Sequence, residues 1–177
     1  MTMKKTILTY GLLTGAVIIG SMIWGIVASE GKSGVSVWFG YLIMLVAMTM
    51  IFVGVKRYRD HEFGGVIGFG RAFALGLGIA LMASIIYVLA WEAYLALTDH
   101  AFIHNYANSI IKARQDAGIS DEDLLALRAK MDDLKTQYAN PLFRLPMTFA
   151  EIFPLGLLVS LVSAALLRLP KVFPARG

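Results

Sequence analysis

Four long apolar stretches constrain this chain more than any other feature of its sequence. Each is long enough to cross the hydrocarbon core of a bilayer, which is about 30 Å thick and needs roughly 20 helical residues. None carries a charged residue at its centre. Because lipid cannot hydrogen-bond a bare backbone, each stretch is expected to be a helix. The predicted spans are Thr6–Ala28, Val35–Val55, Ala72–Leu97 and Met147–Leu167.

The composition favours the same class of protein. Of the 177 residues, 58% are hydrophobic and only 16% are charged, which is far more apolar than a soluble domain of this length. We therefore predict an all-α polytopic membrane protein in which residues 1–177 form a single four-helix membrane domain. The first span exceeds the roughly 7–15 apolar residues of a signal peptide, so we interpret it as an uncleaved helix. Cysteine is absent, which excludes disulfide and thiol chemistry.

Basic residues near the ends of the spans indicate how the chain is oriented. In a four-helix topology nine of them fall on one side, whereas the first short loop on the other side holds only Lys32. Because such residues accumulate on the cytoplasmic side, both termini are expected in the cytoplasm. These borders also explain most of the net charge of +4, so nucleic-acid binding is not expected. The nine residues are Lys4, Lys5, Lys56, Arg57, Arg59, Arg71, Arg168, Lys171 and Arg176.

Three tryptophans agree with this orientation. Trp24, Trp38 and Trp91 all fall at the predicted outer boundary, and Tyr41 and Tyr94 lie nearby in the sequence. Aromatic residues of this kind gather at the membrane interface, so the pattern predicts an aromatic belt.

Small residues predict close packing between helices. The pattern Gly11-x-x-x-Gly15 in the first span lets a second helix approach the backbone, either in a dimer or within the same subunit. Because four helices already supply neighbours, packing within the subunit is favoured. The third span carries small residues on two faces, and we interpret it as the central helix.

The segment between the second and third spans is rich in glycine. Residues His61 to Arg71 read HEFGGVIGFGR, and they lack the lysine and the serine or threonine of a phosphate-binding loop. We expect this segment to dip into the membrane interface, with its hydrophobic side chains in lipid and Arg71 reaching back to the head groups.

Residues around this segment resemble a known family. The order Tyr58-Arg59-Asp60, Gly64-Gly65 and Phe69-Gly70-Arg71-Ala72-Phe73, followed by Gly76, is similar to a bacterial inner-membrane family known only as domain of unknown function four-one-nine-nine. The resemblance covers nearly the whole chain, with four spanning helices and a long loop before the last. It implies a fold and a bacterial inner-membrane location. It implies no activity and identifies no functional residue.

Residues 98–146 are expected to form a helical hairpin outside the cytoplasm. The first helix should end at Gly118, and the second should begin with Ser120 as its N-cap and stop at Asn140-Pro141. Neither helix can bury an apolar stripe alone, so the two should pack together. Three arrangements stay open: the hairpin docks a partner, it stands without a partner, or a helix lies on the bilayer surface. The two stripes are Ile103, Tyr106, Ala107, Ile110 and Ile111, and Leu124, Leu127, Met131, Leu134 and Tyr138.

Two histidines at the start of this region have a spacing that can bind zinc. Asp99-His100-x-x-x-His104 would place both on one helix face, but no third ligand is evident. We therefore predict no metal site and no cofactor.

Two acidic residues inside the predicted spans are the candidate functional residues. Glu92 lies near the outer end of the third span, and Glu151 lies at a similar depth in the fourth, which Pro154 should kink. The two carboxylates can share a proton, pair with Arg144 or bind a cation, or each can simply face water or head groups.

These observations predict an integral inner-membrane protein that is structural, accessory or partner-docking. The alternative is a small oligomeric transporter or channel that uses Glu92 and Glu151. No spacing of nucleophile and base supports an enzyme. The expected partners are the lipid bilayer and either another protein or a second copy of this chain, and the sequence names no small-molecule ligand.

Overall fold

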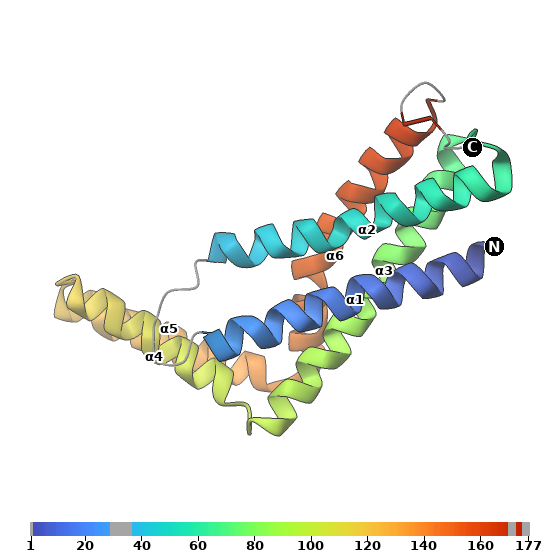
Figure 1. Ribbon diagram of the computed structural model, residues 1–177. Coiled ribbons are helices and arrows are strands. Elements are labelled where there is room, and N and C mark those ends of the chain that lie inside the picture. Colours follow the sequence, from blue (N-terminus) through green and yellow to red (C-terminus); the bar gives the residue numbers. More distant parts are fainter. Residues whose placement is uncertain (1, 29–36, 170–172, 175–177) are drawn as a thin grey trace. The chain divides into compact units, whose positions relative to one another are not determined.

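The computed structural model describes residues 2–28, 37–169 and 173–174, and side chains from 2–23, 41–169 and 173–174. Within these ranges the chain is helical and contains no strand (Figure 1). Four of the helices, α1, α2, α3 and α6, are long and apolar enough to cross a membrane, which confirms the expected number of apolar helices. The six helices are α1 (Met3–Ala28), α2 (Val37–Phe63), α3 (Phe69–Leu97), α4 (Ala101–Asp116), α5 (Asp121–Ala139) and α6 (Pro141–Leu167).

Two of the apolar helices extend well beyond their predicted spans. Helix α2 continues through polar residues to Phe63, and α6 begins at Pro141 instead of Met147. The early start of α6 has a local cause. Proline suits the first position of a helix, and Asn140, just before Pro141, is a residue type that caps helix N-termini. The Oδ1 atom of Asn140 accepts the N–H of Leu142 at 3.0 Å, and its carbonyl accepts the N–H of Arg144 at 3.0 Å. Asn140-Pro141 therefore ends α5, as predicted, and also begins α6.

The chain divides into two compact units. The first unit is residues 1–87 with residues 149–177, and the second unit is Val88–Thr148. The second unit is larger than the expected insertion at residues 98–146, because it includes the last part of α3 and the first part of α6.

In the first unit, α1 and α3 run in the same direction with their backbones close together. A Cβ built on Gly78 would lie 2.6 Å from Ile7, one on Gly11 would lie 2.6 Å from Met82, and one on Gly15 would lie 2.7 Å from Ile86. The residue numbers of the contacting pairs increase together along both helices, so α1 and α3 are parallel. The Gly11-x-x-x-Gly15 face therefore packs within the chain, as we expected, and is occupied by α3.

Helices α2 and α6 run opposite to α3. Gly76 of α3 faces Ile51 and Ser160, whereas Gly156 of α6 faces Ala80 and Met48. Directions thus alternate along the chain, and the start of α1, the end of α2, the start of α3 and the end of α6 share one end of the first unit. One apolar core joins the four helices, with Ile18, Met48, Ile79 and Ile152 among its buried members.

The glycine-rich turn between α2 and α3 departs in part from our expectation. Gly64 and Gly65 have φ angles of 57° and 94°, the left-handed region in which glycine is favoured, and they end α2. Val66 and Phe69 are exposed, as expected of side chains that enter lipid. Ile67 is instead buried in the apolar core of the first unit, so the expectation of a lipid contact is wrong for this residue.

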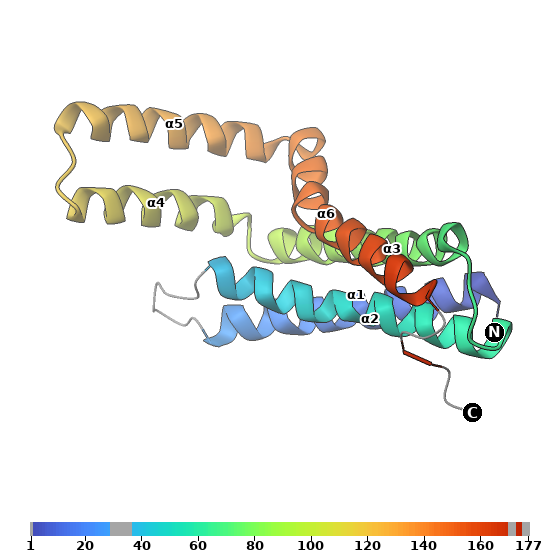
Figure 2. The same cartoon turned by 90° about the horizontal axis from the view of Figure 1, so that it is seen from above.

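In the second unit, α4 and α5 contact each other and lie side by side in both views (Figures 1 and 2). Gly118 between them has a φ of 76°, and the Ser120 hydroxyl accepts the N–H of Asp123 at 3.1 Å, so the predicted N-cap is confirmed. The stripes face inward except for Tyr106, which is exposed. Buried Ile103 and Tyr138 join Leu95 of α3 in a small apolar cluster.

Candidate functional site

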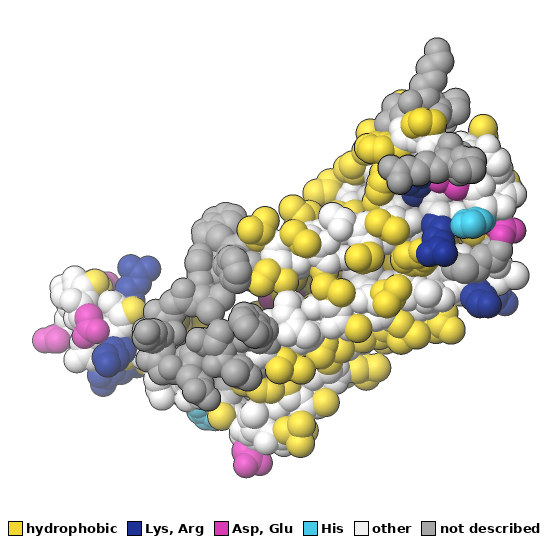
Figure 3. Space-filling model, viewed as in Figure 1, with side chains coloured by type: hydrophobic (Ala, Val, Ile, Leu, Met, Phe, Trp, Pro, Cys, Tyr) yellow, Lys and Arg dark blue, Asp and Glu magenta, His cyan; other side chains and the backbone are white. Residues whose placement is uncertain are grey.

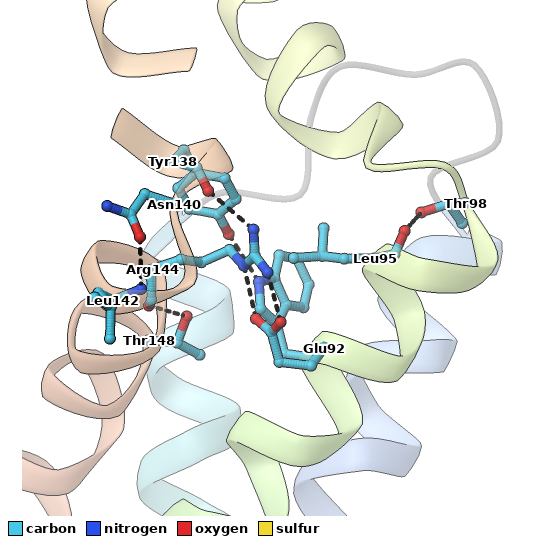
Figure 4. Close-up of polar contacts among 9 residues, drawn as sticks. Glu92, Leu95, Thr98, Tyr138, Asn140, Leu142, Arg144 and Thr148 are labelled. Carbon is cyan, nitrogen blue, oxygen red and sulfur yellow. Dashed lines mark hydrogen bonds and ion pairs between the residues drawn. The ribbon is translucent and has the colours of Figure 1, made fainter. Parts of the chain in front are cut away.

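An ion pair joins the two ends of spanning helices that fall in the second unit (Figure 4). The Nε atom of Arg144 donates to Oε1 of Glu92 at 2.7 Å, and its Nη2 atom donates to Oε2 at 2.6 Å. This two-pronged contact is the geometry in which a guanidinium binds a carboxylate most strongly. Of the options that the sequence left open for Glu92, the structure therefore contains pairing with Arg144.

Residues of α5 complete the surroundings of this pair. The third guanidinium nitrogen, Nη1 of Arg144, donates to the carbonyl oxygen of Tyr138 at 3.0 Å, and the Arg144 guanidinium lies 5.8 Å from the Tyr138 ring centre. The Tyr138 hydroxyl accepts the indole N–H of Trp91 at 2.8 Å. We call Trp91, Glu92, Tyr138 and Arg144 the polar clamp, because together they connect α3, α5 and α6.

The polar clamp is largely withdrawn from solvent. The side chain of Arg144 is 4% exposed and that of Glu92 is 27% exposed. Removing one partner of such a buried pair costs about 3–5 kcal/mol, because the other charge is left uncompensated. Arg144 also lies in the first turn of α6, where the helix dipole disfavours a cation, so the Glu92 carboxylate offsets both penalties. The hydrogen bonds of the clamp thus join the ends of α3, α5 and α6 to one another.

Aromatic side chains surround the clamp on the side of α4. The ring of Phe102 lies 4.8 Å from Trp91 and 6.4 Å from Tyr138, and the Trp91 and Tyr94 rings lie 5.3 Å apart. Trp91, a member of the predicted aromatic belt, is half-buried and donates a hydrogen bond within the clamp. The side chains of Trp24 and Trp38 lie outside the described part of the chain.

Glu151, the second candidate acid, belongs to α6 in the first unit and has no part in the clamp. Its side chain is exposed, and no ion pair involves it among the described residues. The helix continues through Pro154 without ending. A functional role for Glu92 or Glu151 as an acid remains a prediction.

The two histidines do not share a helix face. The N–H of His100 bonds to the carbonyl of Leu95 at 2.9 Å, and Asp99 and His100 have φ angles of 47° and 57°. This turn ends α3, and α4 begins only at Ala101. The expected helical spacing of His100 and His104 is therefore wrong. Within the described residues no three acidic or histidine side chains gather as metal ligands.

A second buried arginine lies in the first unit, and the sequence does not predict its burial. Arg59 of α2 is fully buried, and its Nε atom donates to Oδ1 of Asp60 at 2.7 Å. Its other nitrogens reach the carbonyls of Leu167 at 3.4 Å and Phe173 at 2.5 Å. A cation suits the C-terminal end of a helix such as α6. Of the other basic residues expected at this end, Lys171 and Arg176 lie outside the described residues.

Sequence signals for these two arginines were weak. Arg59 stands in a run of charged residues that also fits a simple stop signal at the membrane border. Arg144 follows Pro141 by three positions, and the preference of proline for the first helical position would have placed it in the first turn of α6. No local signal connects Trp91 with Tyr138, because that hydrogen bond spans 47 positions.

Comparison with known proteins identifies a family. The family model described as "Protein of unknown function (DUF4199)" matches residues 9–168, which is most of the chain, so the chain belongs to this family. No curated protein and no solved structure was found to match the chain.

Proposed function

With membership of this family as the premise, we propose that the protein is a bacterial inner-membrane protein whose α4–α5 hairpin docks a partner outside the cytoplasm. In this proposal both termini are cytoplasmic, and the role is structural or accessory. The family carries no described activity, so the proposal rests on the geometry of the chain itself.

The distribution of basic residues supports the orientation. Lys4, Lys56, Arg71 and Arg168 belong to the helix ends that share one end of the first unit, the arrangement that the positive-inside rule assigns to the cytoplasm. Helix α3 is continuous over 29 residues, about 43 Å at the usual helical rise. A helix of this length that starts at the cytoplasmic side is long enough to cross the hydrocarbon core of about 30 Å, so we place α4 and α5, which follow it, on the opposite side.

The polar clamp is the observation that carries the docking role. The pair of Glu92 and Arg144 and the bond from Trp91 to Tyr138 fix the base of α4 and α5 to the ends of α3 and α6. A hairpin that binds nothing does not require a fixed orientation. A docking element, in contrast, gains affinity when its binding surface is already held in one orientation. The inward-facing stripes leave a mainly polar outer surface, from which Leu125, 72% exposed, and Tyr106, 44% exposed, protrude.

The buried hydroxyl groups give less support to a transporter or channel. The Ser84 hydroxyl donates to the carbonyl of Ala80 at 2.8 Å, and that of Ser160 donates to Gly156 at 2.7 Å. Both bonds stay within one helix turn, so these groups are already satisfied and offer no chain of polar sites to an ion. We also propose that the protein has no catalytic activity of its own, since the clamp residues are tied up in structural bonds.

Photocrosslinking in intact cells tests the docking role. A benzoyl-phenylalanine at position 106 or 125 projects from the outer surface of α4 or α5, whereas the same probe at buried Met131 is the matched control. We expect positions 106 and 125, but not 131, to form an adduct with a distinct protein. Adducts with a second copy of this chain alone would replace docking by a homo-oligomeric assembly, and absence of any adduct would contradict the proposal.

A further inference from the structure

The basic end of the first unit carries exposed arginines beside exposed apolar side chains. Arg57 is exposed near the end of α2, and Arg71 is exposed in the first turn of α3. Between them in the sequence, Val66 and Phe69 are also exposed although both are large and apolar. Figure 3 shows basic side chains gathered at this end of the unit, with hydrophobic side chains spread over the surface of the helices next to it.

Two acidic residues, Asp60 and Glu62, also belong to this end of the unit. Asp60 is engaged elsewhere, because it accepts a hydrogen bond from Lys56 at 2.6 Å and another from buried Arg59 at 2.7 Å. Arg71 rests on an aromatic face, with its guanidinium carbon 4.8 Å from the centre of the Phe63 ring. This contact holds the cation in place, and the Arg71 side chain remains exposed, so an anion can reach it.

The apolar neighbours make this surface continuous with the lipid-facing helices. Phe69 stacks on Phe73 with ring centres 6.0 Å apart, and α3 continues from there as a spanning helix. An exposed apolar patch rimmed by cations matches a molecule that has an anionic head and a hydrocarbon tail.

We propose that this surface, defined by Arg57, Val66, Phe69 and Arg71, binds phospholipids with anionic head groups. The two guanidinium groups take the head-group phosphates, for which the planar donor fork of arginine is suited. Val66 and Phe69 lie against the upper part of the acyl chains. The inference deepens the proposed function, since it rests on this end of the unit meeting a membrane interface.

Lipid binding to the full-length protein tests the proposal. The protein is purified in detergent micelles doped with phosphatidylglycerol or phosphatidylcholine, and bound lipids are counted by native mass spectrometry. The test variant combines Arg57→Gln with Arg71→Gln, and the matched control combines Lys112→Gln with Arg128→Gln, which removes two exposed cations from α4 and α5. A third variant, Arg57→Lys with Arg71→Lys, keeps both charges.

We expect wild-type protein to prefer phosphatidylglycerol, and this preference to fall about fivefold for each cation removed, or about 25-fold in the test variant. The control should keep the wild-type preference, and the lysine variant should keep most of it. Added salt should weaken the preference, because exposed charges are screened.

Two results would overturn the proposal: a test variant that retains the wild-type preference, or a wild-type protein that does not distinguish the two lipids. If the glutamine variant loses helical content by circular dichroism, the lysine variant and the salt dependence of the wild type decide. Extraction of wild-type membranes at high pH distinguishes failure of the proposed membrane function from failure of the proposed lipid binding. Release of the protein would refute the proposed membrane function, whereas retention without lipid preference would refute lipid binding alone.

Discussion

Glu92 and Arg144 lie 52 positions apart in the chain and are joined by two parallel hydrogen bonds of 2.7 and 2.6 Å. The carboxylate comes from the last turns of α3, and the guanidinium comes from the first turn of α6. This one contact therefore joins the residues just before and just after the segment that forms α4 and α5. The stability of those two helices should depend on it, which a mutant cycle can measure.

A double-mutant cycle of Glu92→Gln and Arg144→Gln should give a coupling energy of about 1–3 kcal/mol, as contacting charged residues do. Each single variant leaves the remaining charged side chain without its ionic partner, so each should be less stable than the wild type. Hydrogen exchange in α4 and α5 should speed up in both variants. The measurement is denaturant unfolding of the purified protein in detergent, followed by hydrogen exchange of the same samples.

Glu151 offers the matched control, because it is an acid of α6 with no ion pair among the described residues. Glu151→Gln should leave unfolding and hydrogen exchange near wild type, and its coupling to Arg144→Gln should be close to zero. A coupling for Glu92 no larger than that for Glu151 would mean that the clamp does not fix the hairpin.

The close approach of α1 and α3 gives a second prediction. Gly11→Ala and Gly15→Ala should each destabilise the protein by about 1–3 kcal/mol, because the added methyl group would press on Met82 or Ile86. Self-association should not change, since this face is already covered within the chain. Unfolding in detergent measures the first effect, and chemical crosslinking in membranes measures the second.

Gly20→Ala is the control for this pair, because nothing lies within 4 Å of a Cβ at position 20. There the substitution should be neutral or stabilising, as alanine favours the helix more than glycine does. Loss of a crosslinked dimer in Gly11→Ala, with unfolding unchanged, would instead identify the face as a contact between subunits.

The apolar helices were predictable because the bilayer imposes a length and excludes charge, and these rules can be read from each segment alone. Local end signals were equally informative, as Ser120 and Gly118 show. Contacts between distant segments had no such signal. Sequence patterns marked Glu92 as unusual, but they could not select Arg144 from the other options. They also misplaced His100, since the left-handed turn after α3 was not recognised.

Arg59 supplies a third prediction, which concerns the chain after α6. Arg59→Met should free the carbonyls of Leu167 and Phe173 from their shared donor and loosen the ring contact between Phe173 and Phe52, whose centres lie 5.2 Å apart. It also leaves Asp60 without one of its two partners, so a loss of about 3 kcal/mol is expected. Limited proteolysis of inside-out vesicles should cut the C-terminal segment faster than in wild type.

Arg57→Met is the control for Arg59, because Arg57 lies two positions away in α2 and is exposed. Proteolysis of this variant should match wild type, although its lipid preference should fall. Equal cleavage of the Arg57 and Arg59 variants would show that the buried guanidinium does not hold the C-terminal segment.

The start of α5 gives the last prediction. Ser120→Ala removes the hydroxyl that accepts the N–H of Asp123, and loss of such a cap costs about 1 kcal/mol. Ser120→Thr should keep the cap, because the threonine hydroxyl can accept the same N–H and can donate to the Asp123 carboxylate as serine does at 2.6 Å. Hydrogen exchange at residues 121–124 should therefore rise in the alanine variant and not in the threonine variant. If the hairpin docks a partner, crosslinking from position 125 should weaken in step with this fraying, whereas crosslinking from position 106 in α4 should hold. Equal loss at both positions would mean that the two helices open as one element, and that the first turn of α5 has no separate stability.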